Sequence, residues 1–151
     1  MGAMQRRKGA EFERTVAKEL FERLGIDFNR NLKQYQTSGQ GDLTTDAPGW
    51  GFSIECKHCN TANLPAWRRQ AVEAARATDQ LPCVIYRVTR GPIRVSVPLR
   101  AFCDAWPSDE WAEITLDGFC LLAREIMAES AAWQPNDYRR LRDQIVGEGA
   151  E

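Results

Sequence analysis

The 151-residue sequence has only one histidine, His58, and five cysteines that are scattered along the chain. No second Cys-x-x-Cys pair and no histidine pair accompanies Cys56, His58 and Cys59, so the sequence does not supply the four ligands of a zinc site. We therefore expect no zinc. The cysteines are interpreted as reduced side chains that are mostly buried.

Long apolar runs are also missing. No stretch of 18 or more apolar residues is present, and the N-terminal region is basic and polar, which predicts neither a membrane span nor a secretory signal. The sequence has no internal repeat and no low-complexity tract. At 151 residues and 43% hydrophobic content, we expect a single domain over residues 1–151, located in the cytoplasm, in which residues 1–3 can be an expression scar.

Charge is distributed unevenly along the chain. Residues 1–100 contain 16 Lys and Arg against 10 Asp and Glu, whereas residues 101–151 contain 4 against 11. A basic N-terminal part favours a polyanionic partner, although a solvated surface gives the same pattern. The asymmetry alone therefore assigns no function.

Hydrophobic periodicity predicts an α/β domain with a mixed sheet flanked by helices. We expect helices over residues 7–25, 65–78, 98–106 and 117–130, and a further helical stretch after Pro135. We expect strands that begin near residue 43 and run over 50–57, 83–89, 93–97 and 112–116. A hairpin turn over residues 46–49 joins the first two strands.

The first helix carries a carboxylate on its apolar side. Its apolar stripe passes through Val16 and Leu20, and continuing the stripe towards the N-terminus reaches Glu13, whereas Glu11 falls on a solvated row. A charge on the buried side is costly unless it is paired or binds a metal. Glu13 is therefore a candidate functional residue.

Two more carboxylates converge across the predicted hairpin. Strand alternation places Phe52, Ile54 and Cys56 in the core and presents Ser53, Glu55 and Lys57 on the other face. Asp42 precedes Glu55 by thirteen residues on the facing arm. Because two adjacent carboxylates repel, a shared divalent ion would hold both ionised, and oxygen ligands favour Mg²⁺ or Mn²⁺. Lys57, about 6.6 Å further along the strand, is expected beside the metal, where it can position the attacking water, and Glu13 can complete the metal shell through water.

Three segments resemble the PD-(D/E)XK nucleases, and within them the Holliday junction resolvase-like enzymes of archaea and phages. They are Arg7–Arg14, Ser38–Leu43 and Ile54–Lys57, and the resemblance covers about residues 6–99. It implies a restriction-endonuclease-like core followed by additional C-terminal helices, with Glu13, Asp42, Glu55 and Lys57 as catalytic residues. It also implies a Mg²⁺-dependent endonuclease for branched DNA in a bacterial or phage-infected cell. Because a four-way junction presents two symmetric strands, a homodimer is expected.

Several side chains are candidates for contact with DNA. The resemblance implies that Arg14, Arg30 and Ser38 approach the DNA backbone near the scissile phosphate. The further candidates are Arg7, Lys8, Lys33, His58 in the loop expected after the strand, and the pair Arg68 and Arg69. For His58, a solvent-exposed loop position is favoured, and for the arginine pair a solvated helix face is an equal alternative.

The sequence also departs from the family pattern. Gly41 stands where the family name has proline. Gln70 lies where some relatives have the glutamine of a Gln-x-x-x-Tyr motif, but the fourth residue on is Ala74, so we favour a packing or surface role and keep Gln70 as an auxiliary candidate. Two alternatives stay open: a non-catalytic nucleic-acid-binding protein on the same fold, and a duplex restriction or repair nuclease.

Overall fold

A six-stranded sheet forms the centre of the computed structural model, which describes residues 2–32, 41–107 and 109–130. The spatial order of the strands follows the chain: β1 (Asn29–Arg30), β2 (Leu43–Thr44), β3 (Phe52–Cys59), β4 (Leu81–Val88), β5 (Arg94–Pro98) and β6 (Trp111–Thr115). Strands β3 and β4 are parallel, and the other neighbouring pairs are antiparallel. The predicted mixed sheet is confirmed.

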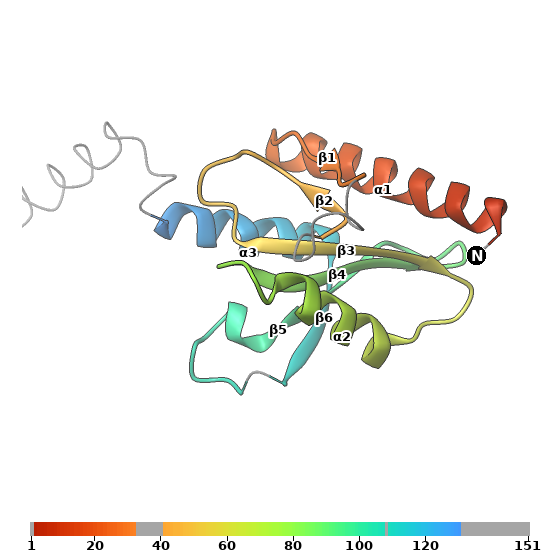
Figure 1. Ribbon diagram of the computed structural model, residues 1–151. Coiled ribbons are helices and arrows are strands. Elements are labelled where there is room, and N and C mark those ends of the chain that lie inside the picture. Colours follow the sequence, from red (N-terminus) through yellow and green to blue (C-terminus); the bar gives the residue numbers. More distant parts are fainter. Residues whose placement is uncertain (1, 33–40, 108, 131–151) are drawn as a thin grey trace, which may run out of the picture.

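Helices cover both faces of this sheet (Figure 1). They are α1 (Ala3–Leu24), α2 (Leu64–Ala75) and α3 (Leu116–Glu129), with a short 3₁₀ helix η1 (Leu99–Ala101). α1 and α3 pack against one face, and α2 packs against the other, where it provides the crossover that the parallel strands β3 and β4 require. This arrangement is consistent with the expected restriction-endonuclease-like core. None of the helices in the described ranges is long and apolar enough to cross a membrane.

Strand β4 is buried on both sides. Cys83 and Ile85 belong to the larger hydrophobic cluster beneath α1 and α3, whereas Val84 and Tyr86 pack in a smaller cluster beneath α2. The sequence of a parallel strand that is covered on both faces is a nearly continuous apolar run, and residues 83–89, which were predicted to form a strand, have this pattern.

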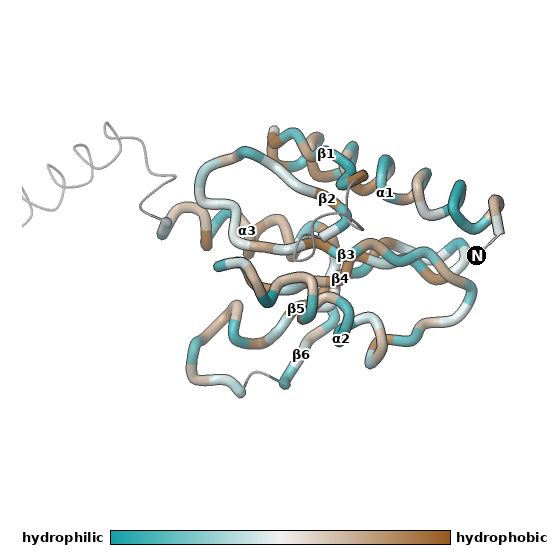
Figure 2. Tube along the Cα trace, viewed as in Figure 1, coloured by the Kyte–Doolittle hydropathy of each residue, from teal (hydrophilic) through white to brown (hydrophobic). Residues whose placement is uncertain are grey.

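α1 is amphipathic, and Figure 2 shows hydrophilic and hydrophobic residues alternating along it. Phe12, Val16 and Leu20 are buried, Glu13 is half-buried, and Glu11 is exposed, as the periodicity predicts. The helix ends at Gly25, whose backbone adopts φ 68° and donates to the carbonyl of Phe21 at 2.8 Å. α1 begins at Ala3, four residues before the predicted start.

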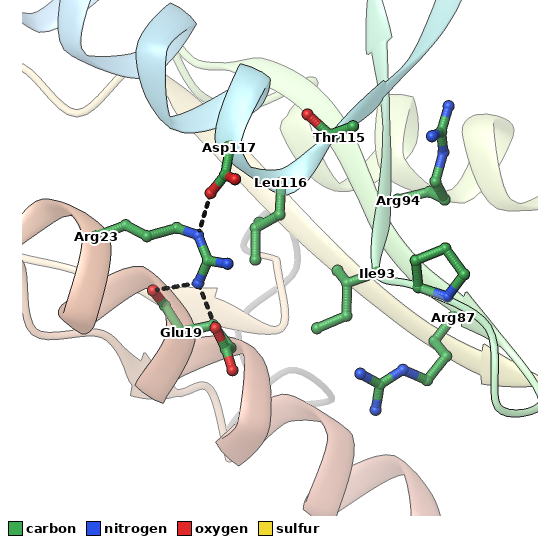
Figure 3. A pocket seen from close by; sticks show the side chains of 9 residues that line it. Glu19, Arg23, Arg87, Ile93, Arg94, Thr115, Leu116 and Asp117 are labelled. Carbon is green, nitrogen blue, oxygen red and sulfur yellow. Dashed lines mark hydrogen bonds and ion pairs between the residues drawn. The ribbon is translucent and has the colours of Figure 1, made fainter.

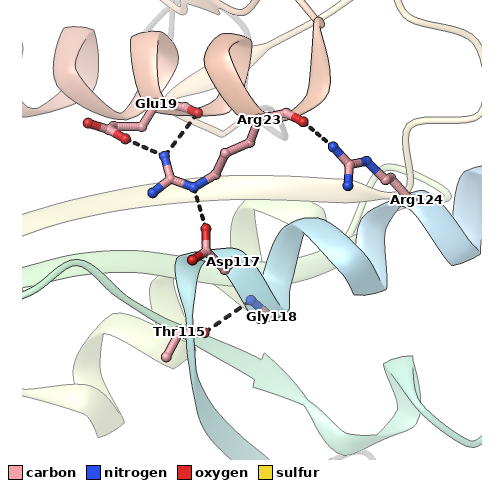
Figure 4. Close-up of polar contacts among 6 residues, drawn as sticks. All are labelled: Glu19, Arg23, Thr115, Asp117, Gly118 and Arg124. Carbon is pink, nitrogen blue, oxygen red and sulfur yellow. Dashed lines mark hydrogen bonds and ion pairs between the residues drawn. The ribbon is translucent and has the colours of Figure 1, made fainter.

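An arginine joins α1 to α3 (Figure 4). The Arg23 guanidinium forms ion pairs with Glu19 on its own helix and with Asp117 of α3, the latter at 2.7 Å. Arg124 of α3 donates to the carbonyl of Arg23. These contacts fix the two helices side by side on one face of the sheet.

Several predicted boundaries were wrong. β3 continues to Cys59 because its parallel pairing with β4 extends to Val88, and β1 was not predicted. The helix expected over 98–106 is only η1, since β5 runs through Pro98 and the chain then turns back into β6. α3 begins at Leu116, one residue before the predicted start, because the hydroxyl of Thr115 caps it by accepting from the amide of Gly118. The stretch after Pro135 lies outside the described residues.

The segment before β2 lies against the backbone of β3. The Asp42 amide donates to the carbonyl of Ile54 at 2.7 Å. A Cβ atom on Gly41 would lie 2.4 Å from that same carbonyl oxygen and 2.8 Å from the Ile54 nitrogen. Only glycine permits this approach, because the neighbouring atoms belong to a central strand that cannot move aside.

Replacing Gly41 by alanine is therefore expected to lower the free energy of unfolding by about 1–3 kcal/mol, the usual cost of forcing extra atoms into a packed region. Denaturant unfolding measures the change. Gly9→Ala is the matched control: no atom lies within 4 Å of the position that its Cβ would occupy, so alanine inside α1 should stabilise the protein by about 1 kcal/mol. Equal stability of the wild type and Gly41→Ala would contradict the close approach.

Candidate active site

Asp42 is held rigidly against β3. Its Oδ2 atom accepts from the amide of Cys56 at 2.7 Å, and its carbonyl accepts from the amide of Asn31 at 2.8 Å. Leu43 pairs with Ile54 in the antiparallel ladder between β2 and β3. Asp42 therefore lies next to the part of β3 that carries Glu55, as the predicted hairpin requires.

Glu55 is buried, with 2% of its surface exposed, and so is its neighbour on the same face, Ser53. The prediction that this face of β3 is presented to solvent was wrong at these positions, because α2 packs against this side of the sheet. Burial, reinforced by the charge of Asp42 and by a hydrogen bond with it, raises the pKa of Glu55 to about 8. The Oε2 atom of Glu55 is buried and has no hydrogen-bond partner among the described residues.

Lys57 is half-buried one step further along the same face. Its Nζ donates to Oε1 of Gln70 on α2 at 2.6 Å. The ammonium is thereby fixed beside the carboxylates. Gln70, for which the sequence favoured a packing or surface role, is exposed on α2 and directly contacts Lys57.

Glu13 approaches from α1, on the opposite side of the sheet from α2. Its Oε2 accepts from Nε of Arg30 at 2.6 Å, and both side chains are largely buried. Burial raises the pKa of Glu13, and the charge of Asp42 adds to this shift, while Arg30 opposes it. The charge of Asp42 therefore acts on both glutamates.

These side chains meet in a cleft of about 470 Å³. Glu13, Asp42, Lys57 and Gln70 line it, and Glu55 lies buried behind the lining. The remaining lining residues are Gln5, Lys8, Gly9, Cys56, His58, Cys59 and Asn60. Three parts of the fold, which are α1, the segment before β2 and strand β3, thus bring the predicted catalytic residues to one place.

The candidates for DNA contact on α1 and β1 divide into two groups. Lys8 lines the cleft, and Arg30 lies next to it through its ion pair with Glu13. Arg7 and Arg14 are exposed on α1 and do not line the cleft. Lys33 and Ser38 lie outside the described residues.

His58 and Arg68 are held by contacts within the protein, whereas Arg69 lies on a solvated helix face, one of the two alternatives for the arginine pair. His58 belongs to β3 and not to a loop, because the ladder with β4 continues past it; its Nε2 bonds to the carbonyl of Thr89 at 3.0 Å and its ring packs against Phe12. Arg68 forms an ion pair with Glu113 at 2.8 Å, whereas Arg69 is exposed. Neither arginine lines the cleft.

Two amide side chains and one strained residue at the cleft were not predicted from the sequence. Gln5 and Asn60 line the cleft, and Thr89, with φ 49°, hydrogen-bonds to the segment that ends β3. Neither Gln5 nor Asn60 belongs to a sequence motif, so nothing in the sequence marks them as cleft residues. The backbone of Thr89 depends on contacts with residues 58–60, which are distant in the sequence.

The carboxylate pair fits a divalent cation. Mg²⁺ is commonly held by one or two carboxylates and several waters, and the unpartnered Oε2 of Glu55 is an atom that such an ion would satisfy. No cluster of three or more His, Cys, Asp or Glu side chains suited to a metal ion occurs within the described ranges. The fit therefore rests on Asp42 and Glu55, with Glu13 further away.

A second hollow, of about 290 Å³, lies between α1, the start of α3 and the turn that joins β4 to β5 (Figure 3). Arg23 lines it and is already paired with Glu19 and Asp117. None of the four predicted catalytic residues lines this hollow. The cleft around Asp42 is therefore the candidate active site.

The raised pKa of Glu55 predicts a pH-dependent stability. The folded state keeps a proton on Glu55 that the unfolded state releases above pH 4.5, so the contribution of Glu55 to stability is fully present below pH 4.5 and falls by a few kcal/mol between there and about pH 8. Metal-free protein can be unfolded in denaturant at a series of pH values. Glu55→Gln, which mimics the protonated side chain, should flatten this decline, and parallel curves for the two proteins would contradict the assignment.

Of the comparisons with known proteins, the one with protein families gives a match. Neither the curated proteins nor the solved structures contain a match to the chain. The model of a family described as "Phage putative PDDEXK endonuclease" matches residues 4–139, which include all four predicted catalytic residues. The chain belongs to this family of phage PDDEXK endonucleases.

Proposed function

We propose that the protein is a metal-dependent DNA endonuclease that hydrolyses phosphodiester bonds in the cleft around Asp42. The observation that carries the proposal is the buried pair of Asp42 and Glu55, which has an unpartnered oxygen and lies beside the ammonium of Lys57. Such a pair is costly for stability, and catalytic sites are where perturbed carboxylates cluster. Family membership supports nuclease activity in general.

Mg²⁺ or Mn²⁺ is the proposed cofactor, with Asp42 and Glu55 as its protein ligands. The chemistry it supplies when bound is Lewis-acid stabilisation of phosphate charge and activation of water. The protein contributes the geometry, because Asp42 is fixed by the Cys56 amide and Glu55 by its place in a central strand.

We assign Lys57 the role of positioning the attacking water and of offsetting charge on the phosphate. Gln70 accepts one of the three ammonium hydrogens, which leaves the others free to donate into the cleft. The water oxygen forms a bond to phosphorus as the bond from phosphorus to one sugar oxygen breaks. The attacking water loses a proton and the leaving sugar oxygen takes one up, so the products are a phosphate monoester and a hydroxyl. The positive charge of Lys57 offsets the negative charge that develops on the phosphate oxygens.

Glu13 is assigned a supporting role. It lies close enough to Asp42 for that charge to raise its pKa, but it is engaged by Arg30. We assign Glu13 to hydrogen-bonding water that surrounds the metal site. Lys8, which lines the cleft, and Arg30, which is paired with Glu13, are assigned to the phosphates that flank the cleavage point.

Branched DNA is the proposed substrate, as implied by the resemblance of three segments to Holliday junction resolvase-like enzymes. Cutting a four-way junction symmetrically requires two active sites, so the proposal includes a two-fold homodimer. The proposed setting is the cytoplasm of a bacterial or phage-infected cell, consistent with a family of phage endonucleases.

Cleavage of four-way junction, duplex and single-stranded DNA in Mg²⁺ tests the site and the substrate together. Lys57→Ala is expected to lower the rate roughly 100- to 1,000-fold, since one charge-stabilising donor is lost. Asp42→Asn should lower it at least as far, and a chelator should abolish cleavage by every variant. The junction should be cut faster than the other two substrates.

The matched control is Lys18→Ala, which removes an exposed lysine on the solvated side of α1. It should cleave as the wild type does. Equal cleavage by the wild type, Lys57→Ala and Asp42→Asn would rule out the assigned site. Binding of DNA without cleavage on any substrate would establish a non-catalytic protein instead, and preferred cleavage of duplex would indicate a restriction or repair nuclease.

A further inference from the structure

The cleft contains two kinds of polar side chain. Its centre is charged, with Glu13, Asp42 and Lys57, whereas amides stand at its rim: Gln5 on α1 and Asn60 in the connection from β3 to α2. Both rim amides are exposed, and neither is hydrogen-bonded through its side chain to another residue of the described part of the chain. Their hydrogen-bonding groups are thus free for a ligand in the cleft.

The backbone of Asn60 is held in place by a strained residue. Thr89 has φ 49°, a region that β-branched side chains rarely adopt. Its hydroxyl donates to the carbonyl of Asn60 at 3.4 Å, and its amide donates to the carbonyl of Cys59 at 2.9 Å. Its own carbonyl bonds to His58. Strain of this kind persists only where the surroundings impose it, and it is typical of functional sites.

Gln5 faces the cleft from the opposite wall. It lies on the same row of α1 as Gly9 and Glu13, four and eight residues further on, so its side chain is directed to the same side of the helix. Gly9 has no side chain, and no atom lies within 4 Å of the position that a Cβ would occupy. Open space therefore lies on the cleft side of α1, between Gln5 and Glu13.

We infer that Asn60, assisted by Gln5, contacts base edges next to the scissile phosphate and gives the enzyme a sequence preference at the cleavage point. This rests on the proposed endonuclease function. Phosphates are bound mainly by Lys and Arg, and Lys8 lines the same cleft, where it is placed for such a contact. An amide presents one donor and one acceptor side by side, which matches the N6 and N7 atoms of adenine. Thr89 is a positioning residue, because it fixes the backbone that carries Asn60.

Cleavage of four-way junction and duplex pools with randomised bases around the cleavage point tests the inference, with the cut ends sequenced. The wild type should favour adenine at one position by about 5- to 100-fold, the discrimination that one bidentate contact provides. Asn60→Ala should remove that preference. Asn60→Asp, which can only accept, should shift the preference towards cytosine, whose N4 amino group donates.

The controls separate base contact from other effects. Lys8→Ala should weaken cleavage of all sequences equally, as expected for a phosphate contact, and Lys18→Ala should leave the preference unchanged. Thr89→Ser keeps the hydroxyl and should keep the preference, whereas Thr89→Gly, which tolerates φ 49°, should weaken it.

A wild type that cleaves without any base preference, or Asn60 variants that retain the preference of the wild type, would overturn the inference while the proposed function stands. A wild type that cleaves no member of either pool would overturn the proposed function, and the inference with it.

Discussion

The candidate active site depends on the close approach of the Gly41–Asp42 segment to strand β3. Because residue 41 has no side chain, the Asp42 amide reaches the carbonyl of Ile54, and the Asp42 carboxylate reaches the amide of Cys56. That contact places Asp42, which lines the cleft, beside Glu55, which is buried. The resulting pair is electrostatically unfavourable without a cation or a proton, and this cost links the fold to the proposed metal chemistry.

The surrounding elements each contribute to this pair. α2 buries Glu55 and, through Gln70, fixes the ammonium of Lys57; α1 contributes Glu13. Helices on opposite faces of the sheet thus contact one end of β3, and the ion pairs of Arg23 hold α1 against α3. A change far from the chemistry, in the packing of α1 or α2, is therefore able to alter the geometry of the carboxylates.

The sequence predicted the parts of the site that follow from local periodicity. Alternation along β3 placed Glu55 and Lys57 on one face, and the helical repeat of α1 placed Glu13 towards the core. It did not predict that Glu55 is buried, because the cover comes from α2, which the crossover between β3 and β4 brings over this face of the sheet. Nor did it predict His58 within β3 or the backbone of Thr89, since parallel pairing with β4 and contacts between distant loops determine both.

We expect Glu55 to hold a proton in the absence of metal and to release it when Asp42 and Glu55 bind a divalent ion. Calorimetric titration of Mg²⁺ at pH 7, in buffers of different ionisation enthalpy, counts the protons released per ion bound. A Glu55 with a pKa of about 8 is mostly protonated at this pH, so close to one proton should be released by the wild type and far less by Glu55→Gln. Mg²⁺ binding without proton release, or no binding at millimolar concentrations, would contradict the account.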